Sequence, residues 1–328
     1  MIKEIQLFRT DCTNPYRNLA VEQTLLETVP EDTCILYLWQ NRRTVVIGRN
    51  QNAWKECRTT ALEADGGFLA RRLSGGGAVF HDLGNLNFTF LVNKADYDLP
   101  RQLSVIVEAC RCLGIPAACS GRNDVLAGGR KFSGNAFYAH QGKSYHHGTL
   151  LVDVDMSAMD RYLSPSRAKM EAKGVSSVRS RVVNLTELKP GLTVNEMASQ
   201  MEDAFQLVYG LPAQRLKETS LDQQRIGELT RRNGSWEWLY GRELACTLNC
   251  GGRFGWGGIE LCLTVEGGVI TQASVYTDAM DWTLGPAVEK ALTGCRFRLE
   301  DMEQGVRSTF LEESVQKDLC RLLAGQDL

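Results

Sequence analysis

The stretch RRLSGGGAVFHDLGNLNFTF, residues 71–90, places three consecutive glycines between two arginines and a histidine–aspartate pair. Successive glycines let the backbone approach a ligand closely and turn neighbouring N–H groups into one anion-binding concavity. An adjacent arginine adds a permanent charge with bidentate geometry for phosphate or carboxylate. The apolar runs 78–80 and 86–91, with Gly84 in the turn, predict a pair of strands behind this loop. The simpler alternative is that the glycines only form a turn or bulge between strands.

The overall composition is that of an ordinary globular protein, with 43% hydrophobic and 23% charged residues among 328. This length predicts about two domains. The formal net charge of −2 provides no general attraction to nucleic acid or to an anionic membrane. The N-terminus lacks the apolar run of a signal peptide, and no apolar run is long enough for a membrane span. We expect a cytoplasmic protein with no nucleic-acid and no membrane partner.

The eleven cysteines are scattered and form no CxxC motif, and the four histidines show no zinc spacing. We interpret the cysteines as reduced thiols that mostly fill the core.

Apolar spacing and turn signals predict an α+β chain. Asn14 and Pro15 are typical of a helix start, and Thr193 with Glu196 forms a capping-box pattern before another helix. A polar stretch after Ser220 predicts a linker near that residue. Strands are predicted at 34–39, 44–48, 78–80, 86–91, 135–139, 144–154, 259–265 and 269–277, and further helices at 103–113, 286–292 and 312–323. We predict a large domain, 1–245, followed by a small α+β accessory domain, 246–328.

The standard nucleotide-binding motifs do not explain the glycine run. The pattern GxGxxG is absent, and the GKS at 142–144 has Phe137 where a P-loop needs its first glycine. If the chain binds a nucleotide, it does so outside both schemes.

A second cluster combines small residues with charged ones, in GRND at 121–124 and GGRKFSGNA at 128–136. Asn123 and Asp124 supply oxygen ligands suited to Mg²⁺, or they cap a turn. Lys131 could reach an α-phosphate or an acyl carboxylate, although a lone lysine is more often a solvated surface residue.

Two further clusters follow. His146 and His147 lead a strand, where they contact a ligand or serve the structure alone. The segment 172–185 is basic and rich in small residues, and it is either a solvated surface loop or a mobile lid over a polyanion.

Together these stretches resemble the lipoate–protein ligase A family, in order and in spacing, over nearly the whole chain. The matching segments are NLAVEQ (18–23), TVVIGRNQNAWKEC (44–57), RRLSGGGAVFHDLGNLNFTF (71–90), SGRNDV (120–125), GRKFSGNAFY (129–138), HHGTLL (146–151), AKGVSSVRSRVVNLTEL (172–188) and FGWGGIEL (254–261). The resemblance implies a large mixed-sheet domain of the biotin/lipoate protein ligase type.

The resemblance also implies an activity. Members of the family activate free lipoate with ATP and Mg²⁺ to lipoyl-AMP, with release of pyrophosphate. They then transfer the lipoyl group to a lysine of a lipoyl domain, either on an E2 subunit of a 2-oxoacid dehydrogenase or on the glycine cleavage H protein. Octanoate is often accepted as well. No tightly bound prosthetic group is expected.

The family pattern assigns roles to individual positions of this sequence. Lys131 is the implied catalytic residue, bridging the α-phosphate and the acyl carboxyl, and Asp124 is the implied metal ligand. The implied ATP-binding residues are Arg72, Gly77, Ala78, Val79, Phe80, Asn123, Asp124 and Lys131. The implied lipoate-binding residues are Arg72, Gly76, His81, Lys131 and His147. The implied adenylate-binding loop contains Lys173, Gly174, Val175, Ser176, Ser177, Val178 and Arg179.

Three other functions compete with this one. An octanoyltransferase of the same fold would need a catalytic cysteine, and Cys119 is the one thiol near a motif. A biotin–protein ligase would carry a GRGRxxR loop, which is absent. A non-catalytic lipoyl- or nucleotide-binding sensor would not need Lys131, Arg72 and the Asn123–Asp124 pair together.

Overall fold

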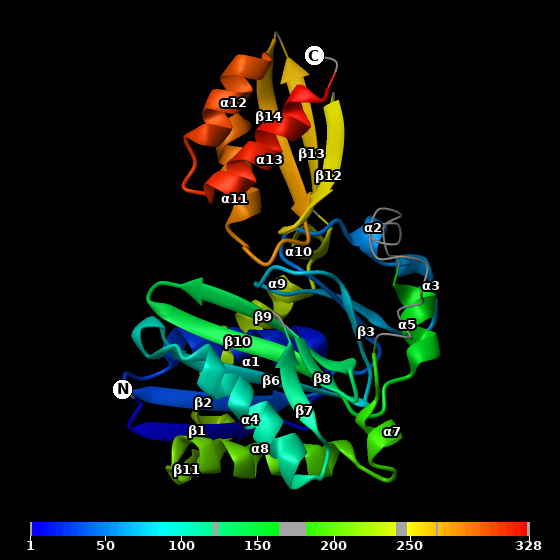
Figure 1. Ribbon diagram of the computed structural model, residues 1–328, viewed down its shortest axis with the longest axis vertical. Helices are drawn as coiled ribbons and strands as arrows, with labels where there is room; N and C mark the ends of the chain where they lie inside the picture. Colours follow the sequence, from blue (N-terminus) through cyan, green and yellow to red (C-terminus); the bar gives the residue numbers. More distant parts are fainter. Residues whose placement is uncertain (1, 121–123, 164–181, 241–247, 267, 327–328) are drawn as a thin grey trace.

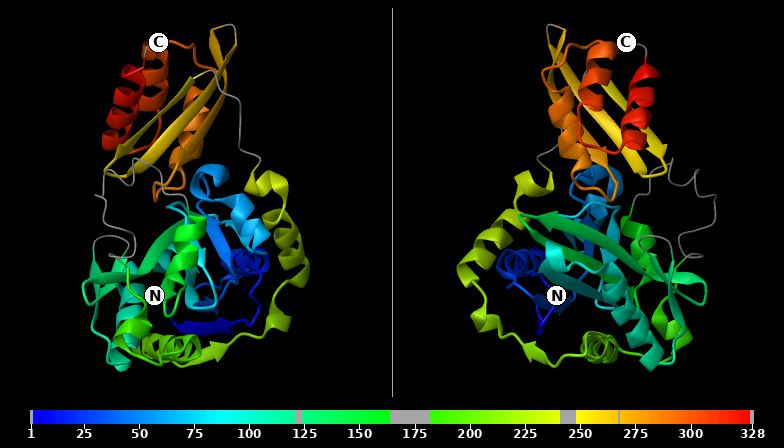
Figure 2. Two further views of the ribbon diagram at one scale, coloured as in Figure 1. Left: turned by 90° about the vertical axis from the view of Figure 1, so that its right-hand side faces the viewer. Right: turned by 60° about the vertical axis from the view of Figure 1, so that its left-hand side comes forward.

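The computed structural model describes residues 2–120, 124–163, 182–240, 248–266 and 268–326, and it divides into a large part and a small C-terminal domain (Figure 1). The two lie end to end along the long axis of the molecule, with α2 (Ala53–Glu56) and α10 (Trp236–Leu239) near their junction (Figures 1 and 2). The predicted boundary between residues 245 and 246 falls outside the described residues and stays a prediction.

An eight-stranded mixed sheet forms the frame of the large part, in the order β11-β1-β2-β6-β10-β9-β8-β7. Its first strands pair in parallel, β11 and β2 with β1, and the remaining neighbours are antiparallel. The strands are β1 (Glu4–Arg9), β2 (Thr33–Trp39), β6 (Asn85–Asn93), β7 (Ala117–Ser120), β8 (Asp124–Ala127), β9 (Arg130–His140), β10 (Lys143–Leu151) and β11 (Ala213–Arg215). The expected mixed-sheet α+β architecture is confirmed.

The two faces of this sheet are covered by different helices. Helices α4 (Leu99–Cys112) and α8 (Val194–Tyr209) pack on one face, where Phe88 and Phe90 of β6 meet Phe205 of α8 in the main core. On the other face, Tyr37 and Trp39 belong to a second core with residues of α1 (Pro15–Thr28) and α9 (Gln223–Asn233). Side chains alternate between faces along a strand, so neighbouring residues of β2 and β6 feed two separate cores.

A second sheet has three strands in the order β4-β3-β5 and carries the glycine run between its outer strands. Its strands are β3 (Thr44–Ile47), β4 (Phe68–Arg71) and β5 (Val79–His81). The predicted pairing of 78–80 with 86–91 is wrong, because β5 pairs with β3 while β6 pairs with β2 and β10. The chain therefore changes sheets at the Gly84 turn, which sequence spacing alone does not reveal.

The helix signals of the sequence mostly hold. Asn14 Oδ1 accepts hydrogen bonds from the backbone N–H groups of Tyr16 and Arg17 at 2.9 and 3.3 Å and starts α1 as predicted. Thr193 caps α8 through the N–H of Glu196 at 3.1 Å, and Gly210 ends that helix with φ +65°.

The linker predicted after Ser220 is wrong, because residues 223–233 form α9 against α1. Its outer face is polar, and Ile226 and Leu229 alone supply the apolar contact with the core.

The strands predicted at 135–139 and 144–154 are antiparallel partners, and so are those predicted at 259–265 and 269–277. Strands β9 and β10 join through Gln141 and Gly142, both with positive φ, so the GKS at 142–144 begins at a tight turn. In the C-terminal domain, β12 (Leu248–Phe254), β13 (Gly257–Glu266) and β14 (Val269–Thr277) form an antiparallel sheet.

Helices α11 (Leu284–Leu292), α12 (Leu299–Arg307) and α13 (Glu313–Ala324) cover one face of that sheet (Figure 1). Helix α12 escapes the sequence analysis because it buries only Met302 and Val306 in an otherwise polar sequence. The shorter helices of the large part are α3 (Thr59–Ala64), α5 (Met156–Tyr162) and α7 (Leu185–Leu188).

The described cysteines are free thiols, and most of them are buried. Within the described ranges, no helix combines the length and apolar character that a bilayer crossing requires.

Candidate active site

The glycine loop, residues 72–78, joins β4 to β5 and packs against a second loop, residues 48–51. Gly76 has φ +88°, a left-handed conformation that favours glycine. A Cβ on Gly48 would lie 2.3 Å from the carbonyl oxygen of Gly76, so the two backbones touch where only glycine fits. The N–H of Arg49 donates to the carbonyl of Ser74 at 2.9 Å and fastens one loop to the other.

Arg72 holds the glycine loop from within. Its guanidinium donates to the carbonyls of Gly75 and Gly77, both at 2.7 Å, and to that of Val46 at 3.1 Å. Burial lowers the pKa of Arg72 to about 10, which leaves it charged at neutral pH. The Arg72 donors thus bond to carbonyls of the glycine loop itself and of β3. The predicted contact of Arg72 with lipoyl-adenylate stays a prediction.

Ser74 connects the glycine loop to the large sheet through a chain of buried polar groups. Its hydroxyl lies 2.8 Å from Nε2 of His147 on β10, and His147 Nδ1 lies 2.8 Å from Glu22 Oε1 on α1. The same carboxylate oxygen accepts from Thr89 Oγ1 at 2.7 Å, and Thr89 in turn accepts from the Trp39 indole at 3.1 Å. His147 therefore fixes the glycine loop above the strand on which it sits.

Sequence reasoning predicted His147 but missed Glu22 and Thr89. The available signal was weak: Glu22 stands in NLAVEQ, where a glutamate among apolar helix residues reads as an ordinary surface charge. Its burial, with 2% of its surface exposed, results from packing of α1 on the sheet.

Lys131 and Asp124 lie on neighbouring strands, β9 and β8, with Nζ 2.7 Å from Oδ1. The side chains are 37% and 42% exposed, so this pair is open to solvent. A Cβ on Gly134 would come within 3.0 Å of the Lys131 ammonium, and the glycine therefore makes room for it. Lys131, the predicted catalytic residue, is thus open to solvent and paired with a carboxylate, and its catalytic role stays a prediction.

Asp124 offers carboxylate oxygens of the kind that Mg²⁺ prefers. Its predicted companion Asn123 lies outside the described residues. Within the described chain no group of three histidine, cysteine or acidic side chains is arranged to hold a metal ion.

His81 is buried next to Trp39 and stays neutral. Its Nδ1 lies 3.2 Å from Nδ2 of Asn41, whose Oδ1 accepts from Asn18, so Nδ1 is the acceptor and Nε2 carries the hydrogen. Burial, and after it the charge of Arg72, lowers the pKa of His81 to about 3. Its Nε2 is a buried donor with no partner in the described structure, and so is Asn87 Nδ2 on β6. Asn85 Oδ1 on the same strand is a buried acceptor that likewise has no partner there.

His146, the neighbour of His147 on β10, has a structural role. Its ring nitrogens lie 2.8 Å from Asn135 Oδ1 and 3.2 Å from Gln102 Oε1, on the core side of the sheet. Burial lowers the pKa of His146 to about 3.

The remaining predicted nucleotide residues line the exit of the glycine loop. A Cβ on Gly77 would meet nothing within 4 Å, which leaves its backbone approachable. Ala78 and Val79 are half-buried. The Phe80 ring is buried, 5.6 Å from the ring of Tyr162, so only its backbone is suited to contact a nucleotide. The predicted adenylate-binding loop, 173–179, lies outside the described residues.

The C-terminal domain reaches the glycine loop directly, which the sequence did not indicate. The N–H of Gly76 donates to the carbonyl of Ala279 at 2.9 Å. The N–H of Thr277 donates to the carbonyl of Asn50 at 2.8 Å, and Asn50 Nδ2 donates to the carbonyl of Trp282 at 3.1 Å. The Trp282 ring lies 4.8 Å from that of Tyr138 on β9.

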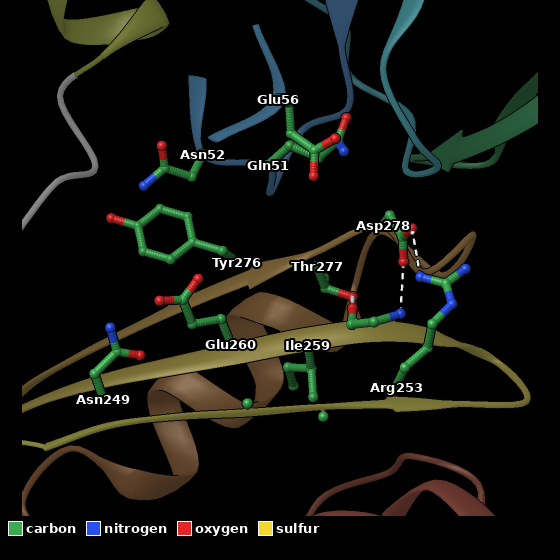
Figure 3. Close-up of a pocket in the computed structure, with 13 residues that line it drawn as sticks. Gln51, Asn52, Glu56, Asn249, Arg253, Ile259, Glu260, Tyr276, Thr277 and Asp278 are labelled. Atoms are coloured by element: carbon green, nitrogen blue, oxygen red, sulfur yellow. Dashed lines mark hydrogen bonds and ion pairs between the residues drawn. The ribbon is translucent and has the colours of Figure 1, made fainter. Parts of the chain in front are cut away.

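A cavity of about 330 Å³ separates the two parts nearby (Figure 3). Gln51, Asn52 and Glu56 line one side and Glu260 and Tyr276 of the small sheet line the other (Figure 3). Neither Lys131 nor His147 lines it, so this cavity is separate from the predicted active site.

Positive charge thus lies within the glycine loop, as buried Arg72, and on β9, where exposed Lys131 pairs with Asp124. The model of the lipoyl protein ligase A/B catalytic domain matches residues 14–206, and that of the bacterial lipoate protein ligase C-terminus matches residues 244–322. The chain belongs to the lipoate protein ligase family.

Solved structures agree with this assignment. LipL1 of P. falciparum in complex with lipoate has 24% identity and a TM-score of 0.86, with 98% of this chain and 100% of that chain covered. A bipartite lipoate protein ligase of Thermoplasma acidophilum, studied with its E2 lipoyl domain, has 26% identity and a TM-score of 0.62, with 75% and 99% covered. A lipoate–protein ligase A bound with ATP has 25% identity and a TM-score of 0.60, with 73% and 98% covered. The fold shared with LipL1 extends over both domains.

Proposed function

We propose that this chain is an ATP-dependent lipoate–protein ligase that salvages free lipoate. It activates lipoate with ATP and Mg²⁺ to lipoyl-AMP and then transfers the lipoyl group to a lysine of a lipoyl domain. The observation that carries this proposal is the Ser74–His147 hydrogen bond, because it holds the glycine loop over β10. His147 and Thr149 lie on one face of β10, and Gly134, which pairs with Thr149, makes room for the Lys131 ammonium on β9.

In the first half-reaction the lipoate carboxylate attacks the α-phosphate, and the bond to pyrophosphate breaks. Anion approaches anion, so the site must supply positive charge and fixed donors. Lys131 bridges the two reactants with its ammonium, which exchanges Asp124 for phosphate oxygen. The glycine loop supplies backbone N–H groups and Arg72 keeps them in place. Asp124 would hold Mg²⁺, which would supply positive charge to neutralise the departing phosphates.

In the second half-reaction the deprotonated acceptor lysine attacks the acyl carbonyl. An amide bond forms, the bond to AMP breaks, and the amine loses a proton. No enzyme nucleophile is needed. Lys131 opposes the negative charge of the tetrahedral intermediate. The acceptors we propose are lipoyl domains of 2-oxoacid dehydrogenase E2 subunits and the glycine cleavage H protein, with octanoate as a second acyl substrate.

The proposal includes the remaining family positions. Lipoate would contact Gly76, His81 and His147, and the loop 173–179 would cover the adenylate and keep water from hydrolysing it. The Gly76 N–H cannot serve a ligand while it donates to Ala279, so the C-terminal domain must move for that donor to become available. We propose that this domain changes position between the two half-reactions.

The octanoyltransferase alternative depends on Cys119. This residue is exposed at the end of β7, and desolvation raises the pKa of its thiol, the opposite of what a thiolate nucleophile requires. The C-terminal match also favours the ligase, because it is a bacterial lipoate protein ligase domain.

ATP–pyrophosphate exchange tests the proposal. Purified protein with ATP and Mg²⁺ is assayed with and without free (R)-lipoate and without acceptor. Exchange that requires lipoate establishes adenylate formation. Absence of exchange removes the ligase proposal, and octanoyl-carrier protein would then be tried as the acyl donor with Cys119→Ala as the control.

A further inference from the structure

Arg71 stands next to Arg72 at the end of β4 and has no part in the mechanism above. It is 4% exposed, and its guanidinium points away from the interior of the glycine loop into backbone carbonyls of two other segments. A buried arginine with this many carbonyl partners organises the chain around it, because the planar fork fixes the direction of every donor.

The first segment is the loop 48–51. Arg71 Nη1 lies 3.2 Å from the carbonyl of Gly48, 3.0 Å from that of Arg49 and 2.6 Å from that of Gln51. Three carbonyls of one short loop therefore converge on a single nitrogen. The carbonyls of this loop lack the regular hydrogen-bond partners of a helix or a sheet, and the guanidinium supplies donors for them instead.

The second segment is α10. Arg71 Nε donates to the carbonyl of Trp238 at 2.9 Å, and Nη2 donates to that of Leu239 at 2.5 Å. The Trp238 indole returns a hydrogen bond to the carbonyl of Arg71 at 3.1 Å. Cations from both sides, Arg49 and Arg232, lie 5.2 and 4.4 Å from the Trp238 ring. Arg71 therefore bonds to α10 and to the loop 48–51 at once, and it fixes the position of the loop relative to that helix.

The loop 48–51, which Arg71 holds, contacts both the glycine loop and the C-terminal domain. On one side Gly48 and Arg49 contact the glycine loop through Gly76 and Ser74. On the other side Asn50 receives Thr277 and donates to Trp282 of the C-terminal domain. The position of one loop therefore sets both the shape of the glycine loop and the seat of the C-terminal domain.

We propose that Arg71 is a positioning residue that couples the docking of the C-terminal domain to the conformation of the glycine loop. It acts through the loop 48–51, which its guanidinium fixes against α10. The coupling inference rests on backbone contacts, and only its catalytic consequence rests on the proposed function. Lysine cannot replace the arginine, because one ammonium cannot reach the carbonyls on both sides.

Amide hydrogen exchange tests this coupling without reference to activity. Two N–H groups report on the two sides of the loop 48–51. The N–H of Arg49, which donates to Ser74, reports on the glycine loop, and the N–H of Thr277, which donates to Asn50, reports on the C-terminal domain. In Arg71→Lys we expect protection at both to fall by about tenfold or more, because at least one charged hydrogen bond is lost. The matched control is Arg101→Lys, since Arg101 also donates to backbone carbonyls, those of Val208 and Tyr209, but lies on α4. That variant should leave both amides at wild-type protection.

Wild-type protection at both amides in folded Arg71→Lys would overturn the inference. If Arg71→Lys does not fold, Asn50→Ala decides instead, because it cuts the contact with Trp282 and keeps the arginine. Faster amide exchange at Thr277 together with Arg49 supports coupling through the loop, and faster amide exchange at Thr277 alone overturns it. Lipoate-dependent pyrophosphate exchange is measured in parallel with a double-mutant cycle. Arg71→Lys and Asn50→Ala should combine to less than the product of their separate losses, whereas Arg101→Lys and Asn50→Ala should multiply. Absence of lipoate-dependent pyrophosphate exchange in the wild type would remove the proposed function, and the result from amide hydrogen exchange would still hold.

Discussion

The glycine loop and the strand that carries Lys131 hold their positive charges in opposite ways. Arg71 and Arg72 are almost fully buried and their donors bond to backbone carbonyls. Lys131 is 37% exposed and bonds to one carboxylate of similar exposure. A buried guanidinium bonded to rigid backbone shapes a site, whereas an exposed ammonium can change partners at little cost. The comparison separates residues that build the proposed active site from the residue that reacts in it.

Lys131→Met gives the largest expected change. Lipoate-dependent pyrophosphate exchange should fall by about 100- to 1,000-fold, the range for loss of one donor to a developing anion. Stability should change by less than about 1 kcal/mol, because the exposed pair with Asp124 contributes little. Exchange kinetics and urea unfolding are measured on the same preparation. Normal exchange in this variant would end the assignment of Lys131.

Arg72→Met should show the reverse pattern in stability. The carbonyls of Val46, Gly75 and Gly77 would lose their buried donor, and we expect the free energy of unfolding to drop by about 3 kcal/mol. Urea unfolding at neutral pH measures this. A drop no larger than that of Lys131→Met would mean that burial does not distinguish the two cations.

The buried histidines extend the contrast to pH. The pKa values of His81 and His146 are lowered to about 3 in the folded state, while an unfolded histidine titrates near 6.5. Between these values the unfolded state binds protons that the folded state refuses, so stability falls as pH falls. From pH 7 to pH 5 each histidine should contribute a loss of about 2 kcal/mol.

Urea unfolding of the wild type at both pH values measures the total loss. His146→Gln removes one of the two contributions, so its loss over the same range should be smaller. An equal loss in the variant would contradict the neutral state of that imidazole.

Asp124→Asn tests the metal side of the exposed pair. An amide retains one oxygen ligand but loses the charge, and we expect the Mg²⁺ concentration for half-maximal exchange to rise by about tenfold. The titration is repeated at saturating ATP to separate metal from nucleotide binding. An unchanged Mg²⁺ requirement would remove Asp124 from the proposed metal site.

Lys317→Ala provides the smallest expected change and calibrates the others. Lys317 and Glu313 form an exposed pair one helical turn apart, 2.7 Å between charged atoms, in the C-terminal domain. Its loss should change stability by about 0.3 kcal/mol and leave pyrophosphate exchange at the wild-type level. A larger loss would show that exposed pairs in this chain contribute more to stability than their solvent exposure suggests.

Local signals predicted those elements that depend on local physics. Asn14 and Thr193 mark helix starts because the side chain of each accepts hydrogen bonds from backbone N–H groups of its own turn. Gln141 and Gly142 mark a hairpin because the turn itself requires positive φ. The predicted pairing of β5 with β6 was wrong because the true partners, β3 for β5 and β2 for β6, are distant in sequence. The turn between β5 and β6 carries no signal of those distant partners.

Chemical identity came from the sequence, and environment came from the fold. Residue type and order alone predict an anion-binding site from the glycine run, the two arginines, Lys131, Asp124 and the histidine pair. Sequence could not tell Arg71, which ends β4, from Arg72, which begins the glycine loop, because the partners of each depend on which distant segments the tertiary structure packs beside it. Nor could it show that Glu22 is buried against His147, or that Ala279 of the C-terminal domain occupies the N–H of Gly76. Burial and long-range hydrogen bonding depend on the packing of distant segments, and only the tertiary structure decides that packing.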